Sequence, residues 1–270
     1  MHVVVCVKQV PDTTNVRINP ETNTLMREGV ESIVNPFDEY ALEQGLMLKD
    51  CHGAKLTVVS MGPPQATAVL RESLARGADD AVLVSSRAFG GADTLATSYT
   101  IAQAIKKACG GKTPDLVLFG KQAIDGDTAQ VGPGVSEFLG VPLVTYVRKI
   151  DVSVGSDGSK FSVESVMDDG VATIEGMLPA VMTVLKESDA PRYAPLSGAI
   201  RAAKADVTVL NEKDIGANPS EIGLKGSPTK VVTIFPPPIQ GGGEKIVSTG
   251  ADAAKTIVDF LEKKGLVKNG

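Results

Sequence analysis

One stretch of the sequence decides the fold that we predict: DLVLFGKQAIDGDTAQVGPGVSEFLG, residues 115–140. Residues 116–119 form a short apolar run typical of a buried parallel strand, which ends at Gly120. The polar loop that follows enters a helix predicted over residues 128–139, with Pro133 in its first turns, where the missing N–H of proline costs nothing. A strand, loop and helix N-terminus of this kind can cradle a phosphate, because free backbone N–H groups and the positive end of the helix dipole meet there.

The loop alone does not identify a nucleotide, since it contains neither a Walker A motif nor a GxGxxG fingerprint. Composition narrows the choice. The chain has 270 residues, enough for one large α/β domain with additions, and its 43% hydrophobic and 22% charged residues are ordinary for a globular protein. A net charge of -5 argues against a nucleic-acid partner, and with 4% aromatic residues and no tryptophan a base-stacking surface is not expected.

The chain offers little for catalysis or metal binding. Its cysteines, Cys6, Cys51 and Cys109, are odd in number and widely spaced and include no CxxC pair, which disfavours disulfides and structural zinc and favours a reducing compartment. The only histidines are His2 and His52, so we predict no catalytic residue and no metal site. With no signal-peptide pattern and no apolar run able to span a bilayer, the sequence predicts a cytoplasmic protein without a membrane span.

Apolar runs alternate with helical patterns along the first part of the chain. The predicted strands are residues 2–7, 56–60, 81–84, 116–119 and 141–144. The predicted helices are residues 36–50, 64–77, 93–109 and 128–139. Strands that alternate with helices of this length predict βαβ units, so we expect an α/β fold with a parallel, Rossmann-like sheet and right-handed crossovers.

The pattern changes near residue 146. From there to residue 185, strands alternate with turns at residues 155–158 and 168–170, which predicts an antiparallel addition built from hairpins. We therefore expect a nucleotide-binding domain over residues 1–188, with the antiparallel addition over about 146–185.

Prolines and glycines punctuate residues 189–270, which we predict to be an extended C-terminal arm that ends in a helix over about 251–263. Such an arm is either a free tail or a segment that wraps a partner. Residues 207–210 and 231–235 are too apolar for a free tail, which favours wrapping around a partner protein.

The acidic pair in the opening loop has two interpretations. Asp125 and Asp127 could hold a divalent metal, but oxygen-coordinated metals need more ligands than a pair one residue apart supplies. Their other role is loop geometry and helix capping, in which Asp127 or Thr128 accepts hydrogen bonds from the first free N–H groups of the helix. We favour capping.

Three other segments end at the same predicted edge of the sheet, the carboxyl edge at which open α/β sheets bind ligands. Cys6 lies near the end of the first strand, Asn35, Phe37 and Asp38 lie at a helix start, and Met61 leaves the next strand. Each alone has an ordinary explanation, because Asn-Pro is a common turn and helix opener, and Cys or Met commonly packs in a core. Their position at successive strand ends predicts a ligand site.

A fourth segment, FGGADTLATS at residues 89–98, predicts a second anion-binding helix start. A flexible glycine pair precedes Asp93 and Thr94, and Thr97 follows one turn later, so hydroxyl and free N–H groups could take a second phosphate or a pyrophosphate. The alternative is an ordinary helix capped by Asp93 after a glycine turn. Two phosphate-competent helix starts on one sheet edge suit a dinucleotide better than a mononucleotide.

These segments resemble the beta subunit of electron-transfer flavoproteins along nearly the whole chain. The matching segments are VCVKQVPD (5–12), NPFDEYALE (35–43), SMGP (60–63), ARGADDAVLVS (75–85), GKQAIDGDTAQVGP (120–133) and PRYAPLSGAIRAAK (191–204). The resemblance implies an adenine nucleotide alpha hydrolase-like fold and a heterodimer whose alpha subunit holds a redox FAD. It also implies that the beta subunit binds a second adenine nucleotide through residues of the predicted pocket: Cys6, Asn35, Phe37, Asp38, Met61, Asp93, Thr94, Thr97, Gly120, Gln122, Ala123, Asp125, Gly126, Asp127, Thr128, Ala129, Gln130 and Val131.

The loop resembles one branch of that family in particular. The housekeeping branch tends to read DDDxxQTGQ and holds AMP, whereas residues 125–133 here read DGDTAQVGP, which resembles the electron-bifurcating branch of anaerobes. That branch carries FAD in place of AMP: NADH delivers a hydride to it, one electron goes to ferredoxin or flavodoxin, and the other passes through the alpha-subunit FAD to an acyl-CoA dehydrogenase-type partner. Gly126 fits this interpretation, since it removes a carboxylate and a Cβ from the rim of a site that would hold a diphosphate.

Two alternatives stay open. The nucleotide could be AMP, held as a structural filler in a non-bifurcating electron-transfer flavoprotein whose redox work is done by the alpha subunit. The chain could also be a stand-alone nucleotide-binding regulatory protein on the same scaffold. The long apolar arm after residue 186 speaks against the second of these, because a free-standing sensor has no need of it.

Residues 191–205 resemble the recognition loop through which partner dehydrogenases dock in this family. Leu196 matches the hydrophobic anchor, which would fill a pocket on the partner. Arg201 and Lys204 match flanking basic positions that steer acidic surfaces, although the basic run of the family is reduced here to these two residues. Without the family match, Leu196 would be taken as an incidental exposed leucine between prolines.

Overall fold

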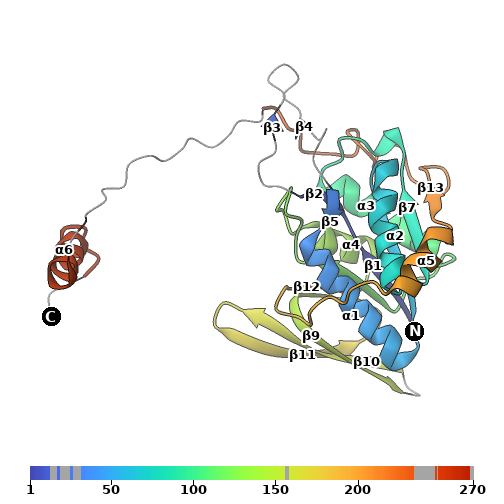
Figure 1. Ribbon diagram of the computed structural model, residues 1–270. Helices are drawn as coiled ribbons and strands as arrows, with labels where there is room; N and C mark the ends of the chain where they lie inside the picture. Colours follow the sequence, from blue (N-terminus) through green and yellow to red (C-terminus); the bar gives the residue numbers. More distant parts are fainter. Residues whose placement is uncertain are drawn as a thin grey trace. The chain divides into compact units, whose positions relative to one another are not determined.

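The computed structural model describes residues 1–12, 17–18, 25–26, 32–155, 158–233, 247 and 249–267. The chain divides into a compact unit over Met1–Val232 and a second unit over Thr233–Gly270. In Figure 1 the first unit contains the large sheet, and the second contains the red helix α6 (Gly250–Lys263).

Nine strands of the described residues form one sheet in the first unit. In spatial order they are β11 (Gly170–Met177), β10 (Gly158–Met167), β9 (Leu143–Gly155), β12 (Ala180–Val184), β8 (Leu116–Gly120), β1 (His2–Cys6), β6 (Lys55–Met61), β7 (Asp80–Val84) and β13 (Thr208–Leu210). Pairing from β9 through to β13 is parallel, whereas β10 pairs antiparallel with β9 and β11. This confirms the predicted parallel sheet with an antiparallel addition. Two short antiparallel pairs precede the first helix: β2 (Gln9–Pro11) with β5 (Ser32–Val34), and β3 (Arg17–Ile18) with β4 (Leu25–Met26).

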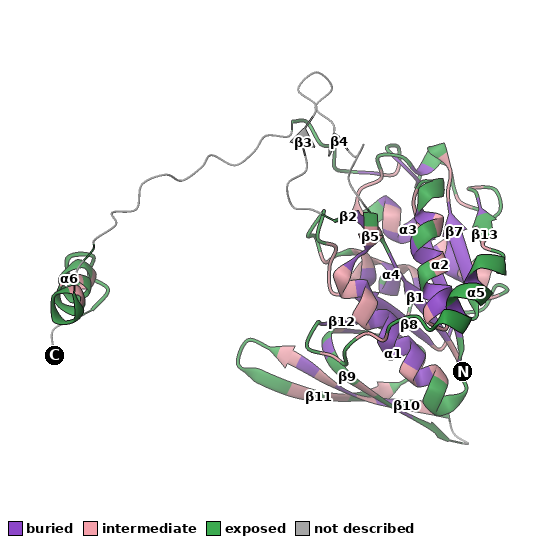
Figure 2. Cartoon of the chain, in the orientation of Figure 1, coloured by how far each residue is buried: buried purple, intermediate pink, exposed green. Residues whose placement is uncertain are grey.

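Helices cover both faces of the sheet. Those of its central part are α1 (Pro36–His52), α2 (Thr67–Arg76), α3 (Thr94–Ala108) and α4 (Val131–Leu139), with short 3-10 turns η1 (Pro64–Ala66) and η2 (Arg87–Phe89). Leu42 of α1 and Leu70 of α2 lie in the core on one face, and Ile105 of α3 and Val135 of α4 lie in the core on the other. Figure 2 shows this arrangement as purple, buried residues along the strands and the inward sides of the helices.

The bounds of α1 follow from its sequence. Pro36 stands at its first position, where its fixed φ suits the helix and its missing N–H is not needed. The helix ends at Gly53, whose left-handed φ of 62° lets its N–H close back on the carbonyl of Lys49. Hydrogen bonds from the Asn35 N–H to the Lys8 carbonyl and from the Lys8 N–H to Asp38 place the N-terminus of α1 next to the end of β1, at the edge of the sheet where the candidate site lies.

Strand β12 pairs differently from the prediction. We expected residues 146–185 to form the antiparallel addition, but β12 pairs in parallel with both β8 and β9. Its sequence, AVMTV, is buried at every position, as expected of a strand that is covered on both faces. The antiparallel addition therefore consists of the later part of β9 with β10 and β11.

The segment after residue 188 belongs in large part to the first unit, which extends to Val232 rather than ending where we placed the domain boundary. Helix α5 (Leu196–Lys204) packs against α2 and buries Ala202, and β13 adds a parallel strand beside β7. Ile215 and Ile222 then join the core on the side of α3. Part of the apolar surface that favoured partner wrapping is thus buried within the unit. The end of the second apolar run, residues 234–235, lies outside the described residues.

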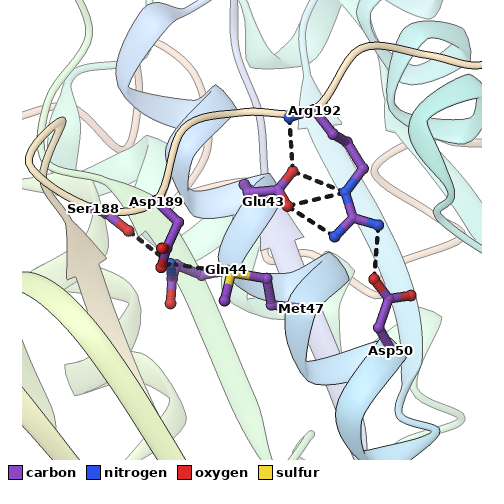
Figure 3. Close-up of polar contacts among 7 residues, drawn as sticks. All are labelled: Glu43, Gln44, Met47, Asp50, Ser188, Asp189 and Arg192. Atoms are coloured by element: carbon purple, nitrogen blue, oxygen red, sulfur yellow. Dashed lines mark hydrogen bonds and ion pairs between the residues drawn. The ribbon is translucent and has the colours of Figure 1, made fainter.

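Residues 186–195 connect β12 to α5 and are fastened to α1 by Arg192 (Figure 3). The guanidinium donates to both carboxylate oxygens of the buried Glu43, at 2.8 to 3.0 Å, and to Asp50 at 2.7 Å. The backbone N–H of Arg192 also donates to Glu43, at 2.9 Å. The hydrogen bonds to Glu43 raise the pKa of the guanidinium further above its ordinary value. A segment without regular secondary structure is therefore held firmly against a helix.

The second unit contains α6, whose bounds confirm the predicted helix over about residues 251–263. Its apolar residues Ile257, Val258 and Phe260 are exposed. In the part of the chain that the structure describes, no helix is both long and apolar enough to cross a membrane.

Candidate nucleotide-binding site

The order of the strands creates a ligand-binding position between β1 and β8. From β1 the chain moves to β6 and then to β7 on one side, and it crosses back to β8 on the other side of β1. The carboxyl ends of β1 and β8 therefore mark the point at which the strand order reverses, and open α/β sheets bind ligands there. The loop of residues 121–130, here called loop 121–130, leaves β8 at this point.

The helix after loop 121–130 begins later than predicted. It starts at Val131 and not at Thr128, because Asp127 and Ala129 have φ angles of 52° and 55°, outside the helical region. Neither Asp127 nor Thr128 caps it: the capping position is Gln130, which makes no side-chain hydrogen bond to the helix start. Left-handed backbone at residues other than glycine stores strain, and such strain is concentrated at binding and active sites.

The acidic residues of loop 121–130 bond to groups of the protein itself. Lys8, just after β1, places its Nζ 2.6 Å from Asp125 Oδ1. The side-chain amide of Gln122 donates to Asp127 Oδ1, and the Asp127 N–H donates to the Ala123 carbonyl at 2.8 Å. Among the described residues, no cluster of three or more His, Cys, Asp or Glu side chains could hold a metal ion. Lys8 directly follows the predicted first strand and leaves it toward this edge, but it is not among the residues that the resemblance assigns to the nucleotide.

Asn35 and Asp38, which the sequence placed among the nucleotide contacts, are buried, with 1% and 7% of their surface exposed. Asp38 joins two strand ends, since it accepts hydrogen bonds from the backbone N–H groups of Lys8 at 2.7 Å and Gly120 at 3.2 Å. Burial raises the pKa of the Asp38 carboxyl to about 7, although the hydrogen bonds from Asn35, Lys8 and Gly120 act in the opposite direction. An acid that changes its charge near neutrality thus lies under the candidate site.

Three other predicted contact residues have packing roles in the structure. The ammonium group of Lys186, which follows β12, lies over the ring of Phe37, 4.6 Å from the ring centroid. Cys6 is buried in the core on the side of α3, where burial raises the pKa of its thiol. Met61 is half-buried and packs against the same core. Cys6 and Met61 therefore have the packing role that their sequence context already offered as the ordinary explanation.

The starts of α3 and α4 lie side by side. This is the arrangement expected if both contribute to one ligand site. Thr94 Oγ1 donates to Gln130 Oε1 at 2.9 Å, across the two helix starts. One turn further along α3, Ser98 Oγ is 3.3 Å from the Val131 carbonyl, to which it donates. A Cβ added to Gly134 would come within 2.4 Å of that hydroxyl, so the glycine permits the close approach of the helices. The half-buried Thr97 lies on the same first turns of α3.

The carboxylate of Asp93 organises the start of α3. Its Oδ1 accepts hydrogen bonds from the N–H groups of Leu95 at 3.0 Å and Ala96 at 3.1 Å, which is the ordinary cap that stood as the alternative to an anion-binding start. Its Oδ2 accepts from the N–H and the hydroxyl of Thr229, at 3.1 and 2.8 Å. Burial alone would raise the pKa of Asp93, but these hydrogen bonds outweigh it and lower the pKa. Asp93 also ties residue 229, near the end of the first unit, to the candidate site.

Packing requires glycine at one position of the site, Gly120, and does not require it at another, Gly126. A Cβ at Gly120 would lie 2.4 Å from Asp38 Oδ1 and 2.6 Å from the Phe37 carbonyl carbon, so only glycine fits there. At Gly126 an added Cβ meets no atom within 4 Å. Glycine at position 126 is therefore not required by packing, and its effect on a ligand would come from the absence of a charged side chain.

The predicted docking residues lie on α5. Leu196, the first residue of the helix, is 78% exposed, and the nearby Tyr193 and Ile200 are exposed as well. Arg201 donates to the Leu74 carbonyl at 2.6 Å, so its guanidinium fastens α5 to the end of α2. Lys204 is exposed. Tyr193 and Ile200, which are not among the predicted docking residues, extend the exposed apolar surface around Leu196.

Comparison with known proteins adds an independent finding. A family model described as the electron transfer flavoprotein domain matches residues 22–215. The chain is 49% identical over 264 residues to the electron transfer flavoprotein subunit beta of Clostridium acetobutylicum, covering 98% of this chain and 99% of the relative. It is 48% identical over 269 residues to the caffeyl-CoA reductase-Etf complex subunit CarD of Acetobacterium woodii, covering 99% and 100%. It is 46% identical over 266 residues to the protein FixA of Azorhizobium caulinodans, covering 97% and 90%.

Proposed function

Because the chain belongs to the electron transfer flavoprotein family, among its beta subunits, we propose that it binds an adenine nucleotide at the carboxyl ends of β1 and β8. The observation that carries the proposal is the pairing of the α3 and α4 N-termini through Thr94 and Gln130, at the edge where loop 121–130 leaves β8. The N-terminus of α4 has no side-chain cap, so its first backbone N–H groups and its positive dipole end can stabilise a phosphate.

We further propose that the nucleotide is FAD. Asp93 occupies the N–H groups of Leu95 and Ala96 at the start of α3, so the donors for a pyrophosphate would be the uncapped N–H groups of α4 together with the Thr94 hydroxyl beside them. Gly126 supports the proposal, since it places no charged side chain at the rim of a site that would hold a diphosphate. The proposed contacts from loop 121–130 and its flanks are Gly120, Gln122, Ala123, Asp125, Gly126, Asp127, Thr128, Ala129, Gln130 and Val131.

When bound, this FAD would supply electron bifurcation: it would take a hydride from NADH and release its electrons separately, to ferredoxin or flavodoxin and to the alpha-subunit FAD. The part of this chain is to hold the cofactor at a fixed position and to set the charge around it. The high identity to a subunit of a caffeyl-CoA reductase-Etf complex supports this choice of branch. AMP in place of FAD, in a non-bifurcating protein, is the alternative.

The partners follow from the same proposal. An alpha subunit would complete the heterodimer, with the C-terminal arm and the exposed apolar residues of α6 covered by it. An acyl-CoA dehydrogenase-type enzyme would dock on α5 around Leu196. The exposed side chain of Leu196 would be the hydrophobic anchor that fills a pocket on this partner. Three free cysteines, Cys6, Cys51 and Cys109, fit a reducing compartment, and we propose the cytoplasm.

The experiment is to co-express the chain with its alpha subunit and to measure the bound cofactors. We expect two FAD molecules per heterodimer, one of which is bleached by NADH. If the heterodimer instead contains one FAD together with AMP, released on denaturation and identified by mass spectrometry, the proposed bifurcation is refuted and the AMP alternative holds. Absence of any adenine nucleotide from this chain would overturn the nucleotide-binding function itself.

A further inference from the structure

We propose that Asn35 and Asp38 are positioning residues of the candidate site, which fix the shape of loop 121–130 through its backbone and do not themselves hold the nucleotide. The proposal rests on the nucleotide-binding function proposed above and assigns these residues a different role from the contact role that the sequence suggested. Both side chains are buried, and the hydrogen bonds given below link each of them to backbone groups of the strand ends or of the loop.

Asn35 bonds to the backbone of the loop in both directions. Its Nδ2 donates to the Gln122 carbonyl at 2.8 Å, and its Oδ1 accepts from the Ile124 N–H at 3.1 Å. Its own backbone N–H donates to the carbonyl of Lys8 at 2.8 Å. The buried side-chain amide thus donates one hydrogen bond to the loop backbone and accepts one from it, as the backbone of a paired strand would. Through Asn35 the end of β1 is joined to the first residues of the loop.

Asp38 makes the matching connection one helical turn later. Its oxygens accept from the N–H groups of Lys8 at 2.7 Å and of Gly120 at 3.2 Å, so the ends of β1 and β8 are bridged by one carboxyl group. The close packing of Gly120 against Asp38 leaves no room for a ligand atom between them. Asp38 therefore acts at the base of the loop.

The loop needs such support because its backbone is strained. Asp127 and Ala129 both have left-handed φ angles, which cost of order 1–3 kcal/mol each at residues other than glycine and persist only where the surroundings enforce them. The bonds from Asn35 fix the loop at Gln122 and Ile124, before the strained residues. Without them, the binding-competent shape would be one of several, and the apparent affinity would fall in proportion to its population.

The test uses two measurements on the full chain prepared without nucleotide. Amide hydrogen exchange is measured on this nucleotide-free protein, and AMP binding is then measured by calorimetric titration. In Asn35→Ala the Ile124 N–H loses its acceptor, so we expect its exchange to be at least about tenfold faster in the nucleotide-free protein. We expect the Kd for AMP to rise by about tenfold or more. The core amides of β6 should keep wild-type exchange.

Gln44→Ala is the matched control. Gln44 is a buried amide on the same helix, α1, but its Nε2 donates to Ser188 Oγ at 2.7 Å and Asp189 Oδ2 at 3.0 Å, away from the loop. This variant should lower global stability by a similar amount, because a buried polar contact is lost in both. Its Ile124 exchange and its Kd for AMP should equal those of the wild type.

Two results would overturn the positioning role. If Asn35→Ala binds AMP weakly while Ile124 keeps wild-type exchange in the nucleotide-free protein, Asn35 is a direct contact. If Asn35→Ala binds AMP with wild-type affinity, the loop does not depend on it. Should Asn35→Ala fail to fold, Asp38→Asn decides the matter: its amide has one acceptor oxygen where the carboxylate has two, so Lys8 or Gly120 should exchange faster and AMP should bind more weakly.

Failure of the proposed function would look different. If the wild-type chain binds neither AMP nor FAD, nucleotide binding is refuted. The exchange of Ile124 in Asn35→Ala still reports then whether Asn35 holds the loop: faster exchange supports that part of the proposal, and unchanged exchange overturns it.

Discussion

Lys8 reaches from the end of β1 to loop 121–130 and places its Nζ 2.6 Å from Asp125 Oδ1, at the sheet edge where the nucleotide is proposed to bind. The side chain of Lys8 is 47% exposed, so its ammonium group can turn from Asp125 toward a bound anion without leaving water. An exposed ion pair of this kind contributes at most about 1 kcal/mol to stability. The value of Lys8 therefore lies in its charge at the site and not in holding the fold.

We expect Lys8→Met to weaken AMP binding by about threefold to tenfold at low salt, in line with the loss of one charge-assisted contact. The difference from wild type should shrink as the salt concentration rises, and the melting temperature should stay the same. Isothermal titration at several salt concentrations checks this. Lys149→Met, at an exposed pair with Asp151 far along β9, is the control. An equal loss of affinity for uncharged adenosine would show that Lys8 acts on loop shape instead.

Gly126→Asp should weaken FAD at the proposed site through charge alone. A Cβ added at position 126 meets no atom within 4 Å and the backbone there is not left-handed, so we expect neither Asp nor Asn to strain the fold. We expect Gly126→Asp to lose FAD on dilution while the alpha-subunit flavin is retained, and Gly126→Asn to behave like the wild type, because it has the same shape without the charge. Flavin counting after gel filtration measures both. Two full flavins in Gly126→Asp would remove the electrostatic reason for assigning FAD to this loop.

The buried Asp38 predicts a pH dependence of stability. Its pKa is raised from 3.8 to about 7 in the folded protein, so between these values the folded state holds a proton that the unfolded state has lost. The contribution of this group is therefore complete below about pH 4 and is lost as the pH rises through 7. The groups that face Asp38 are Lys8, which is paired with Asp125, and the buried Cys6, whose pKa is raised well above its ordinary range.

Urea unfolding from pH 5 to 8 tests this in the wild type and in Asp38→Asn, which cannot titrate. The free energy of unfolding of the wild type should fall relative to that of the variant by up to about 1.4 kcal/mol per pH unit. A constant difference between the two proteins over this range would contradict the raised pKa.

The local parts of this site could be predicted from the sequence. The apolar run at residues 116–119 appears as β8, and Asp93 caps α3 as its position before Thr94 indicates. These features depend on residues close together in the chain, through side-chain periodicity and hydrogen bonds to the next turn. The sequence also predicts that the strand ends meet, because parallel strands joined by helices bring their carboxyl ends to one edge of the sheet.

The parts that the sequence did not predict depend on distant contacts or on backbone strain. The start of α4 at Val131 is set by the left-handed Asp127 and Ala129, and no propensity favours that conformation for alanine. The three-residue β13 is too short for a periodic signal and exists because it pairs with β7. Arg192 bonds to Glu43 across 149 positions, so nothing in the local sequence of either residue indicates the pair.

Arg192→Met should be among the more destabilising changes away from the site. It leaves the carboxylate of Glu43, which is 7% exposed, without its guanidinium partner, and a buried charge that loses its partner is costly. We expect the free energy of unfolding to drop by about 2–4 kcal/mol, less than for a fully buried pair because Arg192 is partly exposed. Urea unfolding measures it. Adding Glu43→Gln should recover part of the loss, and no recovery would mean that the backbone of residues 186–195 was disturbed instead.

The exposed Leu196 gives the sharpest test of partner docking. It is 78% exposed at the first position of α5, so Leu196→Ala should leave the melting temperature and the flavin content of the heterodimer unchanged. Electron delivery to the proposed acyl-CoA dehydrogenase-type partner should slow by about tenfold or more, since the loss of an interface anchor costs about 2 kcal/mol. Val209→Ala, an exposed aliphatic residue on β13, should keep the wild-type rate. Loss of flavin in Leu196→Ala would instead make the residue part of the structure, and an unchanged rate would place the docking surface elsewhere on the molecule.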